Sequence, residues 1–293
     1  MSQRTLWSVA LIAVTAVWGW SFVAKHDALA SMSASALNAW MFGLAAIALL
    51  PLSIRSLKTL ERRDWLGGIV AGGVLFVAFT LQTSGVAHTT PSNAGFITGL
   101  CTVFTPLILF LLGRGRPSSK QALGTVISLI GLGLLSLDGF ALHYGDLLVL
   151  GCALGFALHI VVVSAFSTPA AAMGSALVQL TIVAVLSLAW SVANDELTLP
   201  ASMPTAATLL VLAVFGTALA YAIQTRAQAT LAPQTVALIL ICEPLFSGFF
   251  GYALAGDRLP LERLIGAALI LVGIAVSELR FKREGLGAPA NMP

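Results

Sequence analysis

The sequence predicts an all-α polytopic membrane protein, with ten transmembrane helices arranged as two inverted five-helix repeats. Three observations support this fold class. Only 9% of the 293 residues are charged, against roughly 25% in a soluble domain, and the mean hydropathy is +0.96. The apolar residues form ten long runs, and the two halves of the chain resemble each other. So few charges could not cover a soluble core, which excludes a cytosolic enzyme, a disordered chain and a nucleic-acid-binding protein.

The ten charge-poor runs are each long enough to cross a lipid bilayer, which takes about 20 helical residues. They are too long and too continuously apolar for the roughly 10-residue alternating strands of a membrane barrel. The first run exceeds the roughly 7–15 residues of a cleaved signal core, so we expect a retained helix. The predicted spans are 5–24, 34–54, 65–86, 91–112, 119–137, 146–166, 171–192, 206–225, 232–254 and 261–279.

The basic residues are unevenly divided between the two sets of alternating loops. Twelve of the fifteen Lys and Arg residues fall in the set that includes both termini. The opposite set holds only Lys25, Arg258 and Arg263. Since basic loops remain on the cytoplasmic side of a membrane, we expect a multi-pass protein whose N-terminus and C-terminus are both cytoplasmic.

The second half of the chain repeats features of the first half at two offsets. At an offset of 142, Gln82-Thr83 returns as Gln224-Thr225, and Gly124 and Gly131 return as Gly266 and Gly273. At an offset of 138, Trp18-Gly19 aligns with Phe156-Ala157, and Thr105-Pro106-Leu107 aligns with Glu243-Pro244-Leu245. The two offsets differ by four residues, which is about one turn of a helix.

Each half holds five predicted spans, and because five is odd the second copy must enter the membrane inverted. Inverted repeats are typical of secondary transporters, with the substrate site at the repeat interface. A duplication retained only for packing is the alternative. The predicted domains are the first repeat at 1–140, the second, inverted repeat at 141–281 and a short cytoplasmic tail at 282–293.

Polar groups inside the spans are the candidates for function, because they are costly in a bilayer. Glu243 is the only carboxylate in the middle of a predicted span. It is the candidate for proton coupling, with a structural role against nearby backbone carbonyls as the alternative. Pro106 and Pro244 are the only mid-span prolines. They mark the fourth and ninth spans as hinges, or alternatively as packing kinks.

Aromatic and amide side chains recur at helical spacing and favour an amphipathic small molecule over a bare ion. His159, in the sixth span, could bind substrate or bond to a neighbouring helix. The three cysteines lie inside apolar runs, no metal-ligand spacing is present and no phosphate-binding glycine loop occurs. The candidate substrate-binding residues are Trp20, Ser21, Phe79, Gln82, Asn93, Phe96, His159, Tyr221 and Gln224.

Five short motifs occur along the chain. Each motif alone is common, but their order and spacing together are specific enough to indicate a protein family. The motifs are Val17-Trp18-Gly19-Trp20-Ser21-Phe22-Val23-Ala24-Lys25, Thr89-Thr90-Pro91-Ser92-Asn93-Ala94-Gly95-Phe96, Thr105-Pro106-Leu107, Gly145-Asp146-Leu147-Leu148 and Glu243-Pro244-Leu245. With them the chain resembles, over nearly its whole length, the EamA-type unit of the drug/metabolite transporter superfamily. The resemblance implies a ten-helix metabolite carrier in the cell inner membrane, often an exporter. Within the superfamily the chain is most similar to bacterial amino-acid exporters, including aromatic amino-acid exporters.

We therefore expect a secondary transporter, and not an enzyme, that exports amino acids or related amphipathic compounds by alternating access. Its partners would be a small-molecule substrate and the lipid bilayer, with no cofactor, no metal, no nucleic acid and no ATP. A monomer is compatible with this pattern, as are both proton coupling and facilitated diffusion. The alternatives are a membrane-embedded enzyme, which would need paired catalytic groups at membrane depth, and a passive channel, which would need a continuous polar stripe.

Overall fold

The computed structural model describes residues 3–113, 117–138, 141–166, 171–231 and 239–278. The predicted tail at 282–293 and part of the ninth predicted span, 232–238, lie outside these ranges. The helices are α1 (Gln3–Leu29), α2 (Ala34–Leu57), α3 (Arg62–Val86), α4 (Pro91–Gly99), α5 (Cys101–Leu111), α6 (Ser119–Ser136), α7 (Tyr144–Phe166), α8 (Ala172–Ala193), α9 (Met203–Val211), the π-helix η1 (Leu212–Leu219), α10 (Ala220–Thr230), α12 (Cys242–Leu254) and α13 (Leu261–Glu278). Two-residue strands, β1 (Leu137–Asp138) and β2 (Ala141–Leu142), pair antiparallel before α7.

The predicted all-helical membrane fold agrees with the length and composition of these helices. In the described ranges, seven helical segments are long and apolar enough to cross a membrane. One of them combines α4 with α5, and another combines α9, η1 and the start of α10. The fifth, ninth and tenth predicted spans contain α6, α12 and α13, of which α6 is apolar but shorter than the seven.

Helices α2, α4 and α9 each begin at a side chain that accepts a hydrogen bond from one of the first backbone N–H groups, which have no partner within the helix. Ser33 caps α2 by accepting a hydrogen bond from the N–H of Ala36, and Ser202 caps α9 in the same way. Thr90 caps α4, whose first residue is Pro91. Proline is favoured at that position because its missing N–H is not needed there.

The start of α4 is also held by a carboxylate from the other half of the chain. Asp257 accepts hydrogen bonds from the backbone N–H of Ser92 at 2.9 Å and from its hydroxyl at 2.6 Å. Asp146, at the start of α7, accepts hydrogen bonds from Thr89 and Asn93. The N-terminus of α4, with its partial positive charge, therefore lies between two buried carboxylates.

Two of the predicted spans are irregular. The fourth is interrupted at Leu100, which separates α4 from α5, so Pro106 lies inside α5 and not at the break. The eighth contains the eight-residue π-helix η1, a form that is rare and often found at functional sites. Pro244 lies in the first turn of α12, where a proline breaks no intrahelical hydrogen bond.

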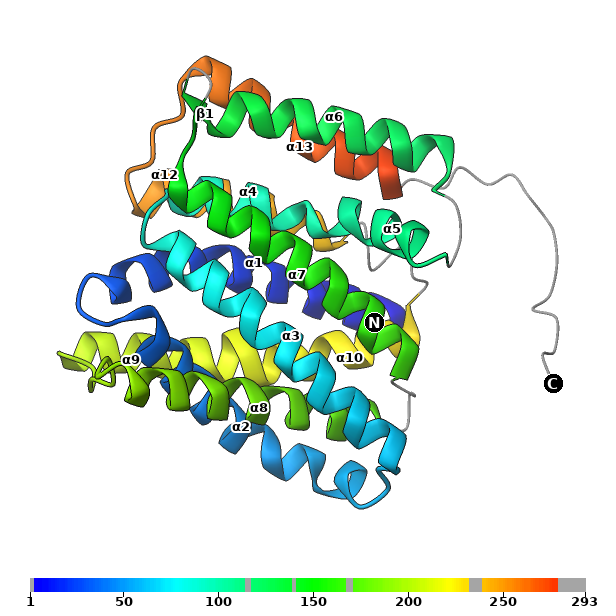
Figure 1. Ribbon diagram of the computed structural model, residues 1–293, viewed down its shortest axis with the longest axis vertical. Helices are drawn as coiled ribbons and strands as arrows, with labels where there is room; N and C mark the ends of the chain where they lie inside the picture. Colours follow the sequence, from blue (N-terminus) through cyan, green and yellow to red (C-terminus); the bar gives the residue numbers. More distant parts are fainter. Residues whose placement is uncertain (1–2, 114–116, 139–140, 167–170, 232–238, 279–293) are drawn as a thin grey trace, which may run out of the picture.

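The helices form three layers (Figure 1). Two helix pairs, α6 with α13 and α2 with α8, lie at opposite ends of the longest axis. Between them, α3 packs against α7, and α1 packs against α12 and α10. The glycines of α6 and α13 allow the backbones of these two helices to approach closely, as small residues do in membrane helix pairs. The middle layer surrounds the cavity described next.

Candidate functional site

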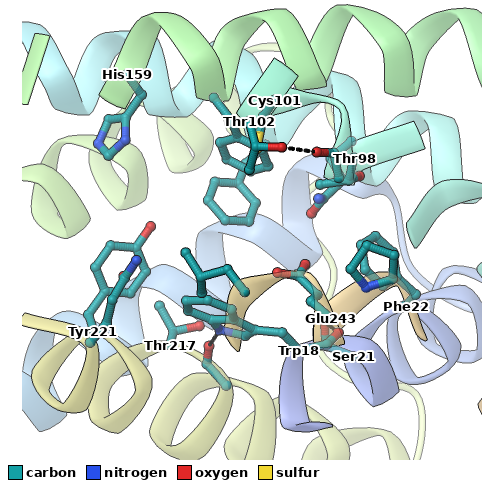
Figure 2. A pocket seen from close by; sticks show the side chains of 18 of the residues that line it. Trp18, Ser21, Phe22, Thr98, Cys101, Thr102, His159, Thr217, Tyr221 and Glu243 are labelled. Carbon is teal, nitrogen blue, oxygen red and sulfur yellow. Dashed lines mark hydrogen bonds between the residues drawn. The ribbon is translucent and has the colours of Figure 1, made fainter. Parts of the chain in front are cut away.

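A cavity of about 200 Å³ opens within the middle layer of helices. Its lining comes from both halves of the chain and is mostly apolar, with a small number of polar groups, as is usual for sites that bind organic molecules. The lining includes Trp18, Ser21, Phe22, Lys25, Phe79, Gln82, Thr102, Phe156, His159, Tyr221, Gln224 and Glu243. Figure 2 shows the cavity with several of these side chains.

Lys25 is the unexpected member of this lining. The charge count by loops places it between the first two spans, but α1 continues to Leu29, and only 4% of Lys25 is exposed. Its Nζ donates a 2.8 Å hydrogen bond to Oε1 of Gln82 in α3. The rings of Phe22 and Phe79 lie 5.6 and 5.3 Å from Nζ, within range for cation–π attraction. The ammonium group is thus held inside the protein.

Glu243 lies on another wall of the same cavity, in the first turn of α12. Figure 2 shows its carboxylate extending into the cavity from the side opposite His159 and Tyr221. A carboxylate in the first turn of a helix is stabilised by the helix dipole. Among the described residues Lys25 and Glu243 form no ion pair with each other, so the two groups share the cavity without direct contact.

The aromatic part of the wall is anchored at the π-helix. Nε1 of Trp18 donates a 2.7 Å hydrogen bond to the carbonyl oxygen of Gly216 in η1. The hydroxyl of Thr217 donates to the carbonyl oxygen of Leu212, five residues earlier, at 3.0 Å. Phe79 makes an edge-to-face contact with Phe156 at 5.1 Å between ring centroids. These contacts fix aromatic surfaces from α1, α3 and α7 around the cavity.

His159 both lines the cavity and bonds to a neighbouring helix. Its Nε2 lies 2.6 Å from Oε1 of Gln179 in α8. The amide nitrogen of Gln179 in turn donates to the hydroxyl of Ser175 at 3.3 Å. The interhelical hydrogen bond considered as an alternative from the sequence is therefore present, together with access to the cavity.

The structure brings together most of the predicted substrate-binding residues and leaves three of them apart. Ser21, Phe79, Gln82, His159, Tyr221 and Gln224 line the cavity, together with the proton-coupling candidate Glu243 and the hinge candidate Pro244. Trp20 packs against one core cluster, and Phe96 is buried in a second core cluster. Asn93 donates to Asp146 at 3.4 Å, near the start of α4.

Trp18, Phe22, Lys25, Thr102 and Phe156 also line the cavity but are not among the predicted substrate-binding residues. Trp18, Ser21, Phe22 and Lys25 are spaced three, four and seven residues apart, which puts them on one face of a helix. That spacing was the signal available in the sequence. Within the described ranges, no group of three His, Cys, Asp or Glu side chains is arranged to hold a metal ion.

Comparison with known proteins gives this geometry its context. The model of the EamA-like transporter family matches the chain twice, over residues 5–137 and 143–279. The chain belongs to the EamA-like transporter family. This agrees with the resemblance noted in the sequence. Family membership indicates a multi-pass membrane transporter rather than an enzyme.

Two relatives have names that agree with this family. An uncharacterized transporter of Archaeoglobus fulgidus is 30% identical over 279 residues, covering 95% of this chain and 87% of the relative. The uncharacterized transporter YyaM of Bacillus subtilis is 23% identical over 255 residues, covering 83% of each chain. A crystal structure that is 20% identical superposes with a TM-score of 0.66 over 94% of this chain and 97% of the other, which shows that the two chains share a fold.

Proposed function

We propose that this EamA-like transporter is a secondary carrier that exports small amphipathic metabolites by alternating access. Amino acids, including aromatic ones, are the leading substrate class. The single observation that carries the proposal is the cavity between the two halves, lined by aromatic rings and amides. Such a lining suits a molecule with both an apolar and a polar part.

Symmetry in the cavity supports the inverted-repeat mechanism. At least six pairs of lining residues are related by one of the two sequence offsets. At 138 the pairs are Trp18 and Phe156, Ser21 and His159, Phe22 and Ile160, and Thr102 and Leu240; at 142 they are Phe79 and Tyr221, and Gln82 and Gln224. A site built from equivalent positions of both copies stays central while either copy closes one end of the pathway.

Helix packing supports ten crossings related by a pseudo-two-fold axis. The contact of α3 with α7 joins the third span to the sixth, and the contact of α10 with α1 joins their counterparts, the eighth span and the first. The pair formed by α6 with α13, like the pair formed by α2 with α8, joins a span to its own counterpart. Both kinds of contact are consistent with a two-fold axis that relates two inverted repeats.

The distribution of charge supports an inner-membrane protein with both termini in the cytoplasm. Because Lys25 is buried in α1, it no longer counts as a loop residue. Removing it leaves two basic residues, Arg258 and Arg263, on the external side against twelve on the cytoplasmic side. The bias expected of cytoplasmic loops is therefore larger than the loop count alone suggested. One chain encloses the cavity, so a monomer suffices for transport.

Purified protein in proteoliposomes, loaded with a panel of amino acids and related amphipathic metabolites, tests this function. We expect protein-dependent counterflow of at least one zwitterionic or aromatic compound, and a rise in the thermal unfolding temperature with that compound, since a ligand stabilises the folded state by mass action. Vesicles that keep a concentration gradient of a small ion while they exchange substrate would indicate a carrier, whereas loss of that gradient would indicate a passive channel. Absence of counterflow for every compound, with folded protein in the vesicles, would contradict the proposal.

An imposed pH gradient in the same vesicles distinguishes the two energetic schemes. If transport is coupled to protons, the gradient drives accumulation of substrate above equilibrium. If the gradient leaves uptake unchanged, the carrier is facilitative. The carboxylate of Glu243 in the cavity favours the coupled scheme, because a carboxylate that faces an alternating-access pathway can take up a proton on one side and release it on the other.

A further inference from the structure

The ammonium group of Lys25 has donors that the protein does not use. A lysine ammonium group has three N–H donors, and in the described part of the chain its one hydrogen bond goes to Gln82. Lys25 is almost fully buried, yet it lines the cavity. A buried charge is stabilised only when its hydrogen-bonding capacity is met, so the unused donors favour an anionic group in the adjacent space.

Gln82 is oriented to assist such a group. Its amide oxygen accepts the hydrogen bond from Lys25, which fixes the orientation of the amide and leaves its nitrogen as a donor. Gln82 also lines the cavity and is 3% exposed. Among the residues that the structure describes, none accepts a hydrogen bond from this nitrogen. An ammonium beside an amide donor is a suitable arrangement for a carboxylate.

The two charges of the cavity also break its repeat symmetry. At the offset of 138, Lys25 corresponds to Val163 and Glu243 corresponds to Thr105, neither of which is charged. The paired lining positions are aromatic, amide, hydroxyl or apolar. Packing of the two copies against each other therefore does not require these charges, whereas a ligand with two opposite charges would.

We infer that Lys25 and Gln82 bind the carboxylate of the substrate, while Glu243 faces its ammonium group and the aromatic wall holds its apolar side chain. This inference rests on the proposed transport function and specifies its substrate class: α-amino acids with a large apolar or aromatic side chain, recognised as zwitterions. Because Lys25 and Glu243 do not contact each other, the substrate lies between them and completes the pairing of both charges.

The rival interpretation is that Lys25 serves only as a long-range counter-charge for Glu243. In that case the substrate could be an amine or a neutral amphiphile, and the carboxylate would not matter. The two interpretations differ in which part of the substrate is recognised, so analogues that lack one charge separate them.

Binding of L-phenylalanine and L-leucine to the purified full chain, measured by calorimetry, is compared with binding of matching analogues. Phenethylamine lacks the carboxylate, and 3-phenylpropionate lacks the ammonium. We expect each analogue to bind roughly 10- to 100-fold more weakly than phenylalanine, the factor that corresponds to loss of one charge-assisted hydrogen bond. If the amine binds as tightly as the amino acid, or if no zwitterion binds, the inference is wrong.

Lys25→Met then tests the residue itself, because methionine keeps much of the length of the lysine stem without its charge. The substitution should weaken phenylalanine binding by roughly 10- to 100-fold, as loss of the carboxylate does, and leave phenethylamine binding unchanged. Lys58→Met, at an exposed position, is the matched control and should change neither. Gln82→Leu should weaken phenylalanine binding less than Lys25→Met does. Unfolding temperatures of the ligand-free variants identify any that fail to fold.

An unaltered ratio of phenylalanine to phenethylamine affinity in folded Lys25→Met would overturn the role of Lys25. Counterflow of other metabolites by the wild type would then still support the transport function. Conversely, wild-type vesicles that transport nothing would remove the transport function and this inference together.

Discussion

Gly131 of α6 and Gly266 of α13 are reciprocal packing partners. A Cβ added to Gly131 would lie 2.6 Å from the carbonyl oxygen of Gly266, and a Cβ added to Gly266 would lie 2.7 Å from the carbonyl oxygen of Gly131. Gly273 meets Gly124 in the same way, seven residues along each helix. The two helices therefore pack antiparallel through matched glycine faces, with backbone against backbone.

Gly131→Ala should destabilise the protein, because the added methyl group meets backbone atoms that cannot move aside independently of their helix. We expect a cost of about 1–3 kcal/mol, seen as a lower unfolding temperature in detergent. Gly73→Ala is the matched control, since a Cβ at that helical position would meet no atom within 4 Å. Equal unfolding temperatures for the two variants would contradict the close packing of α6 with α13.

Asp257→Ala should loosen the start of α4. The substitution removes the acceptor for both the backbone N–H and the hydroxyl of Ser92. Loss of a helix-capping acceptor typically costs about 1–2 kcal/mol. Hydrogen exchange at the first turn of α4 should accelerate in this variant. Exchange should remain as in the wild type for Glu262→Gln, which changes an exposed carboxylate nearby in sequence. Unchanged protection of the first turn in Asp257→Ala would refute the capping role.

Gln179→Leu should destabilise the protein by about 1 kcal/mol by removing the hydrogen-bond partner of His159. The double variant with His159→Leu should lose less than the sum of the two single variants, because removing both polar partners leaves no unsatisfied group. Unfolding temperatures of the four proteins in this double-mutant cycle measure the coupling. Strict additivity would mean that the 2.6 Å contact contributes nothing to stability.

Glu243→Gln should abolish the response to a pH gradient while counterflow at saturating substrate continues. Glutamine retains the size and polarity of the side chain but cannot exchange a proton. The ratio of uptake with and without the gradient, in proteoliposomes, is the measurement, and Glu262→Gln is the control. A Glu243→Gln protein that accumulates substrate like the wild type would show that protons do not couple through this residue.

The positions of the helices were largely predictable from sequence, whereas their ends and faces were not. A long apolar run is favourably transferred from water into lipid, so each such run indicated a membrane-spanning helical segment. Lys25 ended the first predicted span because hydropathy treats every residue as facing lipid. In the structure Lys25 faces Gln82 and two aromatic rings, so α1 continues past it.

The choice between neighbouring side chains also required tertiary structure. Trp18 and Trp20 are equally aromatic, but they lie about 200° apart around an α-helix, so only one can face a given cavity. Trp18 does so. Asn93 is predicted to bind substrate because it is a polar residue in a span, but its amide nitrogen donates a hydrogen bond to Asp146. Sequence cannot distinguish a polar side chain used for packing between helices from one available to a ligand.

The unmatched charges of Lys25 and Glu243 have a consequence for the direction of transport. In a carrier whose two halves were identical, a two-fold rotation would interconvert the inward-open and outward-open conformations, which would have equal energies and equal affinities on the two faces of the membrane. A cation present in only one copy, and an anion present only in the other, remove that equivalence. Under the alternating access proposed above, we therefore expect substrate release to be easier on one face than on the other, and the kinetics of the cycle to differ between influx and efflux.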